Sequence, residues 1–423
     1  MSAMTMKTSR RFFLSGAGAL AASALSGAAS AQDVISDILK STRRGGWDDQ
    51  FDARASDGDR VATTTPIFSP LTVSYIEQAI GQYSGIVAQG GWPVVPATKK
   101  LQLGVVDPDV VALRQRLMVS GDLSTSAGIS QSFDTYVDAA VKRFQARHGL
   151  PSDGVLGQFS YAAMNVSAPV RLGQLETNLV RLREKVVEDL GARYVMVNIP
   201  AAEIEAVEGG RVALRHTAIV GKIDRQTPIL NSAINEIIVN PYWNAPESIV
   251  RKDIIPLMRK DPQYLANNAI RILGPDGIEL DPATIDWNTE DAAKFRFRQD
   301  PGSGNAMASV KINFPSPDGV YMHDTPQQSL FSKLMRFDSS GCVRVQNVRD
   351  LVTWILRDTP GWDRQHFEGA IKTGETTPVQ VVNPVPVYFT YISAWSTGPG
   401  VVQFRDDIYG RDGVDELQIT SSL

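Results

Sequence analysis

The residues best suited to chemistry in this sequence are one cysteine and a histidine ahead of it. Cys342 is the single cysteine among 423 residues, and His323 lies 19 positions before it (342 minus 323). An ordinary thiol has a pKa of about 8.5, so it is only a few per cent thiolate at neutral pH. A neighbouring imidazole can take the thiol proton and later return it to a leaving amine. The pair therefore predicts a cysteine-nucleophile enzyme with His323 as the base.

Two short extended stretches carry these residues. His323 ends the stretch 320–323, and Cys342 lies within Ser339-Ser340-Gly341-Cys342-Val343-Arg344-Val345. We expect a hairpin-like return to bring the thiol and the imidazole together. Gly341 lets the backbone approach closely, so the amides around Cys342 could face a developing oxyanion. Asn347 is the expected N-cap of a helix that anchors the loop.

A lone cysteine can also be a buried structural residue, because free cysteine is among the most buried residue types. One thiol cannot form an intramolecular disulfide or a multi-thiolate zinc site. A phosphatase signature needs arginine six positions after the cysteine, where this sequence has Val348, and the caspase and papain signatures are absent too. The Ser-Gly-Cys context and the upstream His-Asp pair favour a catalytic thiol.

The second half of the chain contains the strands that would position the pair. Extended segments rich in β-branched and aromatic residues are predicted at 194–199, 212–216, 234–239, 309–314, 320–323 and 387–392. The stretch 245–304 is less regular and polar, with a helical start at 250–258. We interpret it as an insertion that could cap a substrate groove.

The first half of the chain is predicted to be helical. Apolar residues recur at helical spacing over 73–87, 110–117, 136–144 and 172–186, and Gly191 is expected to close the last helix. The predicted organisation is a tether and scaffold helix at 32–100, a small helical domain at 101–168, a linking helix at 169–191 and a catalytic domain at 192–423.

The N-terminus is typical of an export signal. Arg10 and Arg11 form a twin-arginine pair before a weakly hydrophobic run, and Ala29-Ser30-Ala31 is a small-x-small cleavage site. Residues 1–31 are therefore predicted to be a twin-arginine signal peptide that delivers the chain to the periplasm. The alternative is an uncleaved anchor, but the run is short and glycine-rich for a span of about 20 apolar residues.

Composition narrows the classes of partner. A length of 423 residues points to two or three domains. The net charge is −4 and no long basic run occurs, which argues against nucleic acid as a partner. The four histidines lack metal-ligand spacing, which argues against a metal site. After signal cleavage, no remaining segment is predicted to span a membrane.

The segment 321–345 resembles the catalytic signature of the L,D-transpeptidase (YkuD) family: a histidine, a spacer and then Ser/Thr-x-Gly-Cys. Flanking motifs resemble its large periplasmic YcbB-like branch, including Thr227-Pro228, Asn240-Pro241-Tyr242-Trp243-Asn244-Ala245-Pro246 and Phe404-Arg405-Asp406-Asp407-Ile408-Tyr409. The stretch 101–168 resembles a small helical peptidoglycan-binding domain through Phe144-Gln145, Gly149-Leu150 and Asp153-Gly154-Val155-Leu156-Gly157.

This resemblance implies an α+β fold, with a β-rich catalytic domain and a separate helical domain, and no metal or organic cofactor. It implies that Cys342 attacks the amide between a diaminopimelate-type third residue and D-Ala of a donor stem. D-Ala leaves with a proton from His323, and an acceptor amine resolves the thioester to a 3→3 cross-link. The implied partners are peptidoglycan stem peptides and glycan.

The resemblance also assigns the neighbouring residues. Many family members have histidine before Gly-Cys, where this sequence has Ser340, whose backbone carbonyl could still orient His323. Arg344 is assigned equally to a substrate carboxylate or to loop structure. Asp324 either orients His323 or points away. The residues expected to contact substrate also include Ser339, Tyr321, Trp243 and Asn240.

Other functions remain open for the same sequence. With water as the acceptor, the thiol would serve an L,D-carboxypeptidase; with a protein amine, it would attach a protein to the wall. A non-catalytic wall-binding scaffold is the third possibility, which the intact His323, Gly341 and Cys342 argue against.

Overall fold

The computed structural model describes residues 61–413. The predicted signal peptide and most of the predicted tether lie outside the described residues. Within 61–413, no helix is both long and apolar enough to cross a membrane.

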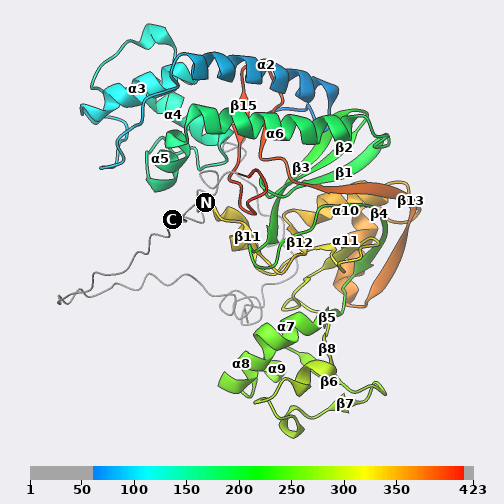
Figure 1. Ribbon diagram of the computed structural model, residues 1–423. Coiled ribbons are helices and arrows are strands. Elements are labelled where there is room, and N and C mark those ends of the chain that lie inside the picture. The colour runs from blue at the N-terminus through cyan, green and yellow to red at the C-terminus, as the bar shows by residue number, and fades with distance from the viewer. Residues whose placement is uncertain (1–60, 414–423) are drawn as a thin grey trace, which may run out of the picture.

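A nine-stranded sheet forms the centre of the molecule (Figure 1). The strand order is β11-β3-β12-β10-β9-β4-β13-β1-β2, and β2 also pairs with β3, so the sheet closes on itself. The strands are β1 (Arg193–Asn198), β2 (Glu203–Glu208), β3 (Arg211–Gly221), β4 (Leu230–Val239), β9 (Val310–Asn313), β10 (Met322–His323), β11 (Phe337–Ser339), β12 (Val343–Val345) and β13 (Thr377–Thr390). All six strands predicted from the sequence are present, with shifted ends.

The largest hydrophobic core lies inside this sheet. It combines inward-facing strand residues with two helices, α10 (Val348–Leu356) and α11 (Arg364–Thr373). On α10 the buried residues Val348, Leu351, Val352 and Ile355 recur at helical spacing, so one face of the helix packs into the core. Because α10 begins three residues after β12, this packing anchors the strand that follows Cys342.

The described chain up to Val186 is helical, as predicted. Its helices are α2 (Pro70–Ala88), α3 (Asp109–Val119), η2 (Thr125–Ala127), α4 (Thr135–Arg147), α5 (Gln158–Asn165) and α6 (Ala168–Val186). The last helix ends at Val186, five residues before the Gly191 that was expected to close it. Helices α3, α4 and α5 share a separate hydrophobic core that includes the fully buried Leu113, Val141 and Phe144.

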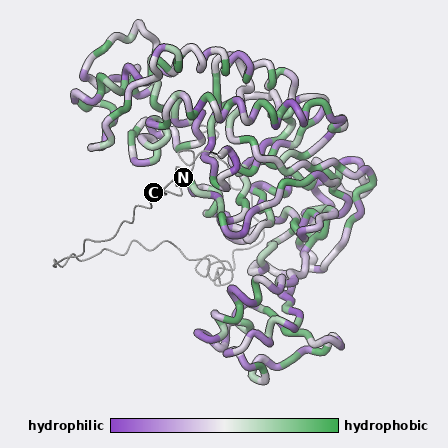
Figure 2. Tube along the Cα trace, viewed as in Figure 1, coloured by the Kyte–Doolittle hydropathy of each residue, from purple (hydrophilic) through white to green (hydrophobic). Residues whose placement is uncertain are grey.

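Helices α2 and α6 lie side by side over one face of the sheet (Figure 1). Hydrophobic and hydrophilic residues recur in turn along both helices (Figure 2). Their apolar faces share a core with β1, β13 and the C-terminal strands β14 (Ala394–Ser396) and β15 (Val402–Phe404). The C-terminal strands β14 and β15 are thereby packed between these helices and the sheet.

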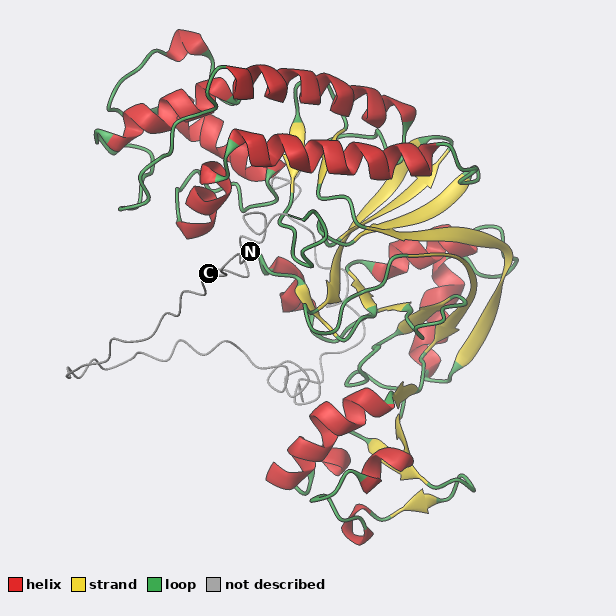
Figure 3. Ribbon diagram, in the orientation of Figure 1, coloured by secondary structure: helices red, strands yellow, loops and turns green. Residues whose placement is uncertain are grey.

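Residues 243–308, here called the insertion lobe, form a separate group of helices and strands beside the sheet (Figure 3). Its elements are β5 (Trp243–Ala245), α7 (Glu247–Ile249), η3 (Val250–Ile254), α8 (Ile255–Lys260), α9 (Tyr264–Asn267), β6 (Ile270–Leu273), β7 (Glu279–Leu280), η4 (Pro282–Thr284), η5 (Asp291–Lys294) and β8 (Arg296–Gln299). The order β5-β8-β6-β7 gives it a four-stranded sheet. The expectation of an irregular polar stretch was wrong, because its apolar residues are spread over elements too short to show a period.

Candidate active site

Strands β10 and β12 are neighbours and run parallel, with Met322 opposite Val343 and His323 opposite Arg344. The predicted hairpin-like return was therefore wrong. The connection instead contains η6 (Gln328–Ser332) and β11, which pairs with β3. Parallel neighbours need such a crossover, whereas a tight turn would have made the pair antiparallel. The crossover still brings His323 and the segment 339–342, here called the nucleophile loop, to one place.

An open cavity of about 610 Å³ lies at this place. Most of the residues predicted for the site line it: Tyr321, His323, Ser339, Ser340, Cys342, Arg344 and Trp243. The insertion lobe supplies the remaining wall through Pro246, Ile249 and Ala306, together with Trp243. The cavity therefore has a polar floor from the sheet and an apolar wall from the lobe.

The ring of His323 is oriented by a backbone carbonyl. Its Nδ1 lies 2.5 Å from the carbonyl oxygen of Asp324. A carbonyl oxygen can only accept, so Nδ1 carries the proton and Nε2 is left as the base. The sequence left Ser340 as one possible source of this carbonyl, and the structure places the carbonyl of Asp324 there instead.

The carboxylate of Asp324 points away from His323. It accepts hydrogen bonds from the Ser309 hydroxyl at 2.5 Å and from the amide of Thr325 at 2.7 Å. Burial raises the pKa of this carboxyl to about 6, while these hydrogen bonds act in the opposite direction. The backbone carbonyl of Asp324 therefore orients the imidazole, while its side chain points away, toward Ser309 and Thr325.

Cys342 is partly buried at the cavity. Burial raises the pKa of its thiol, while hydrogen bonds from Tyr321 and the charges of Lys311 and Arg344 act in the opposite direction. The thiol is therefore protonated at neutral pH. It needs a base to become a nucleophile.

Two cations flank His323 in the sheet. His323 is directly opposite Lys311 on β9 and opposite Arg344 on β12, so the three side chains share one face. Burial, and then the charges of Arg344 and Lys311, lower the pKa of His323 to about 3. The imidazole is therefore neutral at physiological pH and able to accept a proton. The sequence analysis missed Lys311, because its position depends on strand register.

Arg344 is a buried cation that lines the cavity. Its Nη1 is buried and has no hydrogen-bond partner among the residues that the structure describes. Burial lowers the pKa of its guanidinium to about 10. A fork of this kind next to an open cavity is suited to a carboxylate.

The nucleophile loop is fixed by its own serines. The Ser339 hydroxyl donates to the carbonyl of Cys342 at 2.5 Å and accepts from the amide of Gly341 at 3.2 Å. The Ser340 hydroxyl lies 2.9 Å from Nη1 of Arg225. Gly341 has φ +111°, a conformation that side-chain-bearing residues rarely adopt. Gly341 thus permits the sharp path of the chain before Cys342.

Two predicted residues have other roles. Asn240 does not line the cavity; its amide donates to the carbonyls of Ala370 at 3.0 Å and Ile371 at 3.2 Å, at the C-terminal end of α11. Its φ of +47° turns the chain after β4 and directs the side chain to that helix. Asn347 occupies the N-cap position of α10 but makes no side-chain cap hydrogen bond. Its φ of +50° is not the extended conformation of an N-cap.

Comparison with known proteins assigns two segments of the chain. Residues 192–381 match the YkuD family, described as an L,D-transpeptidase catalytic domain. Residues 106–164 match a family described as "Putative peptidoglycan binding domain". A protein of Haemophilus influenzae named "Putative L,D-transpeptidase" is 35% identical over 240 residues, which are 56% of this chain and 48% of that protein. The chain thus spans about half the length of this relative.

Similarity to solved structures is detected at low identity. An L,D-transpeptidase from Xylanimonas cellulosilytica has 18% identity and a TM-score of 0.23, over 70% of this chain and 99% of that chain. One from Stackebrandtia nassauensis has 13% identity and a TM-score of 0.26, over 70% of this chain and 96% of that chain.

Proposed function

We propose that this chain, whose residues 192–381 match the L,D-transpeptidase (YkuD) family, forms 3→3 cross-links in peptidoglycan through a thioester on Cys342. One observation carries the proposal: the only thiol and a neutral, carbonyl-oriented histidine line the same cavity. The family match supports the transpeptidase chemistry, and the cavity supports the assignment of the two reacting side chains.

In the acylation step, Nε2 of His323 takes the proton of the Cys342 thiol. The sulfur then attacks the carbonyl carbon of the third stem residue, and a carbon–sulfur bond forms as the bond to D-Ala breaks. The leaving amine takes the proton back from His323. The carbonyl of Asp324 keeps the imidazole in the required tautomer and orientation throughout.

In the second step, the side-chain amine of an acceptor stem attacks the thioester. A carbon–nitrogen bond forms as the carbon–sulfur bond breaks, and His323 passes a proton from this amine to the sulfur, which regenerates the thiol of Cys342. The apolar wall from the insertion lobe supports a capping role, since Trp243 and Ile249 would shield the thioester from water. Shielding of this kind favours an amine over water as the acceptor.

Arg344 is the residue we assign to a carboxylate of the donor stem. It lines the cavity beside Cys342, and its Nη1 lacks a hydrogen-bond partner within residues 61–413. Lys311 adds a second positive charge on the other side of His323. An anionic stem would therefore be attracted to the face that holds the reacting pair.

The helical domain supports the wall as the partner of this enzyme. Residues 106–164 match a peptidoglycan-binding family, so we propose that they hold the chain on the glycan while the catalytic domain reacts. The twin-arginine pattern in residues 1–31 supports export to the periplasm, where this substrate is found.

Mass spectrometry tests the proposal directly. The protein and its Cys342→Ala variant are incubated with a disaccharide-tetrapeptide, and intact-protein and product masses are recorded. The expected result is a thioester adduct that lacks D-Ala, plus a 3→3 dimer, both absent in the variant.

Two other outcomes would replace the proposal. An adduct that yields only tripeptide would indicate an L,D-carboxypeptidase or an enzyme that attaches a protein to the wall. No adduct on well-folded protein, with wall binding retained in Cys342→Ala, would indicate a non-catalytic scaffold.

A further inference from the structure

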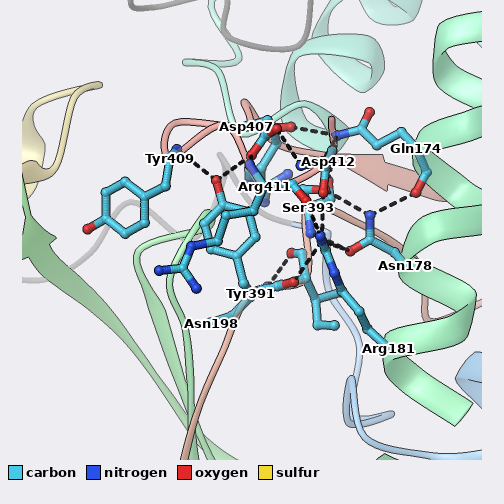
Figure 4. A network of polar contacts seen from close by, with 12 residues as sticks. Gln174, Asn178, Arg181, Asn198, Tyr391, Ser393, Asp407, Tyr409, Arg411 and Asp412 are labelled. Carbon is cyan, nitrogen blue, oxygen red and sulfur yellow. Dashed lines mark hydrogen bonds and ion pairs between the residues drawn. The ribbon is translucent and has the colours of Figure 1, made fainter. Parts of the chain in front are cut away.

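A segment beyond the matched catalytic residues contacts the turn between β3 and β4, which in turn bonds Gly341. The family match ends at residue 381, yet the later residues Asp407, Tyr409 and Asp412 join a polar network beside α6 (Figure 4), and Tyr409 also bonds the turn between β3 and β4. The key side chain is Tyr409. Its hydroxyl donates to the carbonyl of Gly221 at 2.6 Å and accepts from the amide of Thr227 at 3.2 Å.

Thr227 connects Tyr409 to Gly341, the residue before Cys342. Its hydroxyl accepts from the amide of Gly221 at 2.9 Å and donates to the carbonyl of Gly341 at 2.8 Å. A threonine hydroxyl has one proton to donate, so its donor capacity is committed to Gly341. The side chain of Thr227 is fully buried, which strengthens the hydrogen bond.

The carbonyl that Thr227 holds belongs to the peptide between Gly341 and Cys342. In a trans peptide the C=O and N–H groups point in opposite directions. Fixing the carbonyl of Gly341 toward Thr227 therefore fixes the direction of the Cys342 N–H on the other side. Among residues 61–413, this amide donates to no acceptor. It is a free donor at the atom where charge would develop during attack by the thiol.

We propose that Thr227 and Tyr409 are positioning residues that aim the backbone amide of Cys342 at the oxyanion of the tetrahedral intermediate. The inference rests on the proposed attack of Cys342 on a carbonyl, and it holds for any acyl donor. Neither residue touches the substrate. Each acts through the orientation of one peptide plane.

The turn that contains Thr227 is tightly packed against Gly221. A Cβ atom added to Gly221 would lie 2.1 Å from the carbonyl oxygen of Arg225 and 2.7 Å from the amide of Thr227. The turn between β3 and β4 therefore folds back closely on itself. This close approach leaves Thr227 little freedom to point elsewhere.

Tyr409 is itself held from the other side. Its amide donates to the hydroxyl of Tyr391 at 2.9 Å, and that hydroxyl donates to Asp407 at 2.6 Å. Asp407 accepts the amide of Asp412 at 2.7 Å, and Asp412 pairs with Arg181 of α6 at 2.6 Å. Figure 4 shows these side chains converging between α6 and the strands. The segment is thus anchored to a helix outside the catalytic domain.

The test compares two reactions of the same thiol. Acylation of Cys342 by p-nitrophenyl acetate passes through a tetrahedral oxyanion: sulfur bonds to the acetyl carbon, the ester C–O bond breaks and p-nitrophenolate leaves. Alkylation by iodoacetamide needs the same thiol but forms no oxyanion. Both rates are measured on the protein and its variants, with the rate of Cys342→Ala subtracted.

Thr227→Val removes the donor to Gly341 while keeping the shape of the side chain. We expect the acylation rate to fall by about 10- to 100-fold, because misdirecting an oxyanion donor costs rates of this order. The alkylation rate should stay within about twofold. Thr227→Ser retains the hydroxyl and should restore most of the acylation rate. Tyr409→Phe, which acts one hydrogen bond further back, should slow acylation by about threefold to tenfold.

Two variants control for the loss of a hydroxyl alone. Tyr388→Phe removes a phenol that bonds the carbonyl of Leu190, and Thr353→Val removes a hydroxyl that bonds the carbonyl of Arg349 in α10. Both should leave both rates unchanged. Equal losses of acylation and alkylation in Thr227→Val would overturn the inference, and so would no loss of either.

The experiments distinguish a failure of the positioning role from a failure of the proposed function. If the protein fails to cross-link stem peptides but Thr227→Val still slows acylation selectively, the proposed function fails and the positioning role stands. If cross-linking occurs and Thr227→Val acylates at the normal rate, the positioning role is wrong while the function stands.

Discussion

Arg225 and Asp253 form a two-point ion pair, with Nη1 to Oδ2 at 2.8 Å and Nη2 to Oδ1 at 3.2 Å. Asp253 lies in η3 of the insertion lobe and is fully buried, while Arg225 lies in the turn between β3 and β4. The same Nη1 also reaches the hydroxyl of Ser340. One guanidinium therefore joins the insertion lobe to the nucleophile loop, so the cavity wall and the thiol are positioned together.

Breaking this pair should loosen the insertion lobe. Asp253→Asn leaves the Arg225 charge without its carboxylate, and we expect a loss of about 1–3 kcal/mol in the free energy of unfolding. Amide hydrogen exchange within 243–308 should rise, and cross-linking should fall more than alkylation by iodoacetamide. Glu290→Gln, which breaks an exposed contact with Arg251 in the same lobe, is the matched control and should cost little. Unchanged exchange in Asp253→Asn would show that the pair does not hold the lobe.

Substitutions of Cys342 and of His323 should reduce acylation to different extents. Cys342→Ala should abolish adduct formation, because no other thiol exists in the chain. His323→Gln should retain the thiol but lose about 10²- to 10⁴-fold in acylation rate, which is the usual contribution of a general base. Intact-protein mass spectrometry over time measures both. A His323→Gln variant that acylates at the normal rate would assign the base elsewhere.

The pKa of about 3 at His323 has a measurable consequence for stability. A histidine is about half protonated near pH 6.5 in the unfolded chain. Between these values the unfolded state binds more protons, so His323 destabilises the folded state as the pH falls from about 6.5 toward 3. Asp324, with a raised pKa of about 6, contributes with the opposite sign between about 4 and 6.

Comparison with a variant separates these two contributions. Urea unfolding of the protein and of His323→Gln at several pH values should show a shallower loss of stability toward acid in the variant. In NMR spectra, the imidazole signals of His323 are those that are absent from the spectrum of His323→Gln. Their chemical shifts should remain those of a neutral ring from pH 8 to pH 5. A midpoint near 6.5 in those signals would contradict the expected electrostatic environment.

Arg344 should determine how an anionic donor is held. Arg344→Met keeps much of the side-chain volume but removes a charged hydrogen bond worth about 1.5–3 kcal/mol, so KM should rise by about tenfold to a hundredfold. Arg344→Lys should recover only part of this loss, since an ammonium lacks the planar fork. A donor stem with amidated carboxylates should bind the protein and Arg344→Met equally. Equal KM values for the native donor would remove the carboxylate role.

The helix behind the nucleophile strand should be sensitive to cavities. Leu351 is fully buried in the core that α10 shares with the sheet, and Leu351→Ala should cost about 2–5 kcal/mol. Val180 is exposed on α6, and Val180→Ala should change stability by less than about 0.5 kcal/mol. Equilibrium unfolding in urea measures both. A small effect at Leu351 would mean that α10 is less tightly packed than the structure indicates.

Much of the fold could be predicted from the sequence, because most strands and helices have clear apolar patterns. Strand β2 was missed because three of its six residues are glutamates. One of them, Glu205, is buried and pairs with Arg215 at 2.6 Å, which no local pattern indicates. The insertion lobe was misjudged for a related reason, since its core is assembled from many short elements.

Some residues of the site could likewise be predicted from the sequence, and others could not. Cys342 and His323 could be identified because their residue types and motif are specific. Lys311 depends on the register of an antiparallel pair, and Tyr409 depends on a chain return from beyond residue 381. Asn240 was placed in the site by its neighbours in sequence, yet its left-handed backbone turns it toward α11. Contacts between distant segments were therefore the part that could not be predicted.

The parallel pairing of β10 with β12 has a consequence for how freely this sequence can vary. Sheet register places His323 beside Arg344, and the 19-residue spacing plays no part in it. Extra residues inserted near Lys333, an exposed position in the crossover, would leave that register intact. One residue inserted between Cys342 and Val345 would move alternate side chains to the opposite face of the sheet. The crossover near Lys333 can therefore tolerate insertions that β12 cannot, although both lie in the same short stretch of sequence.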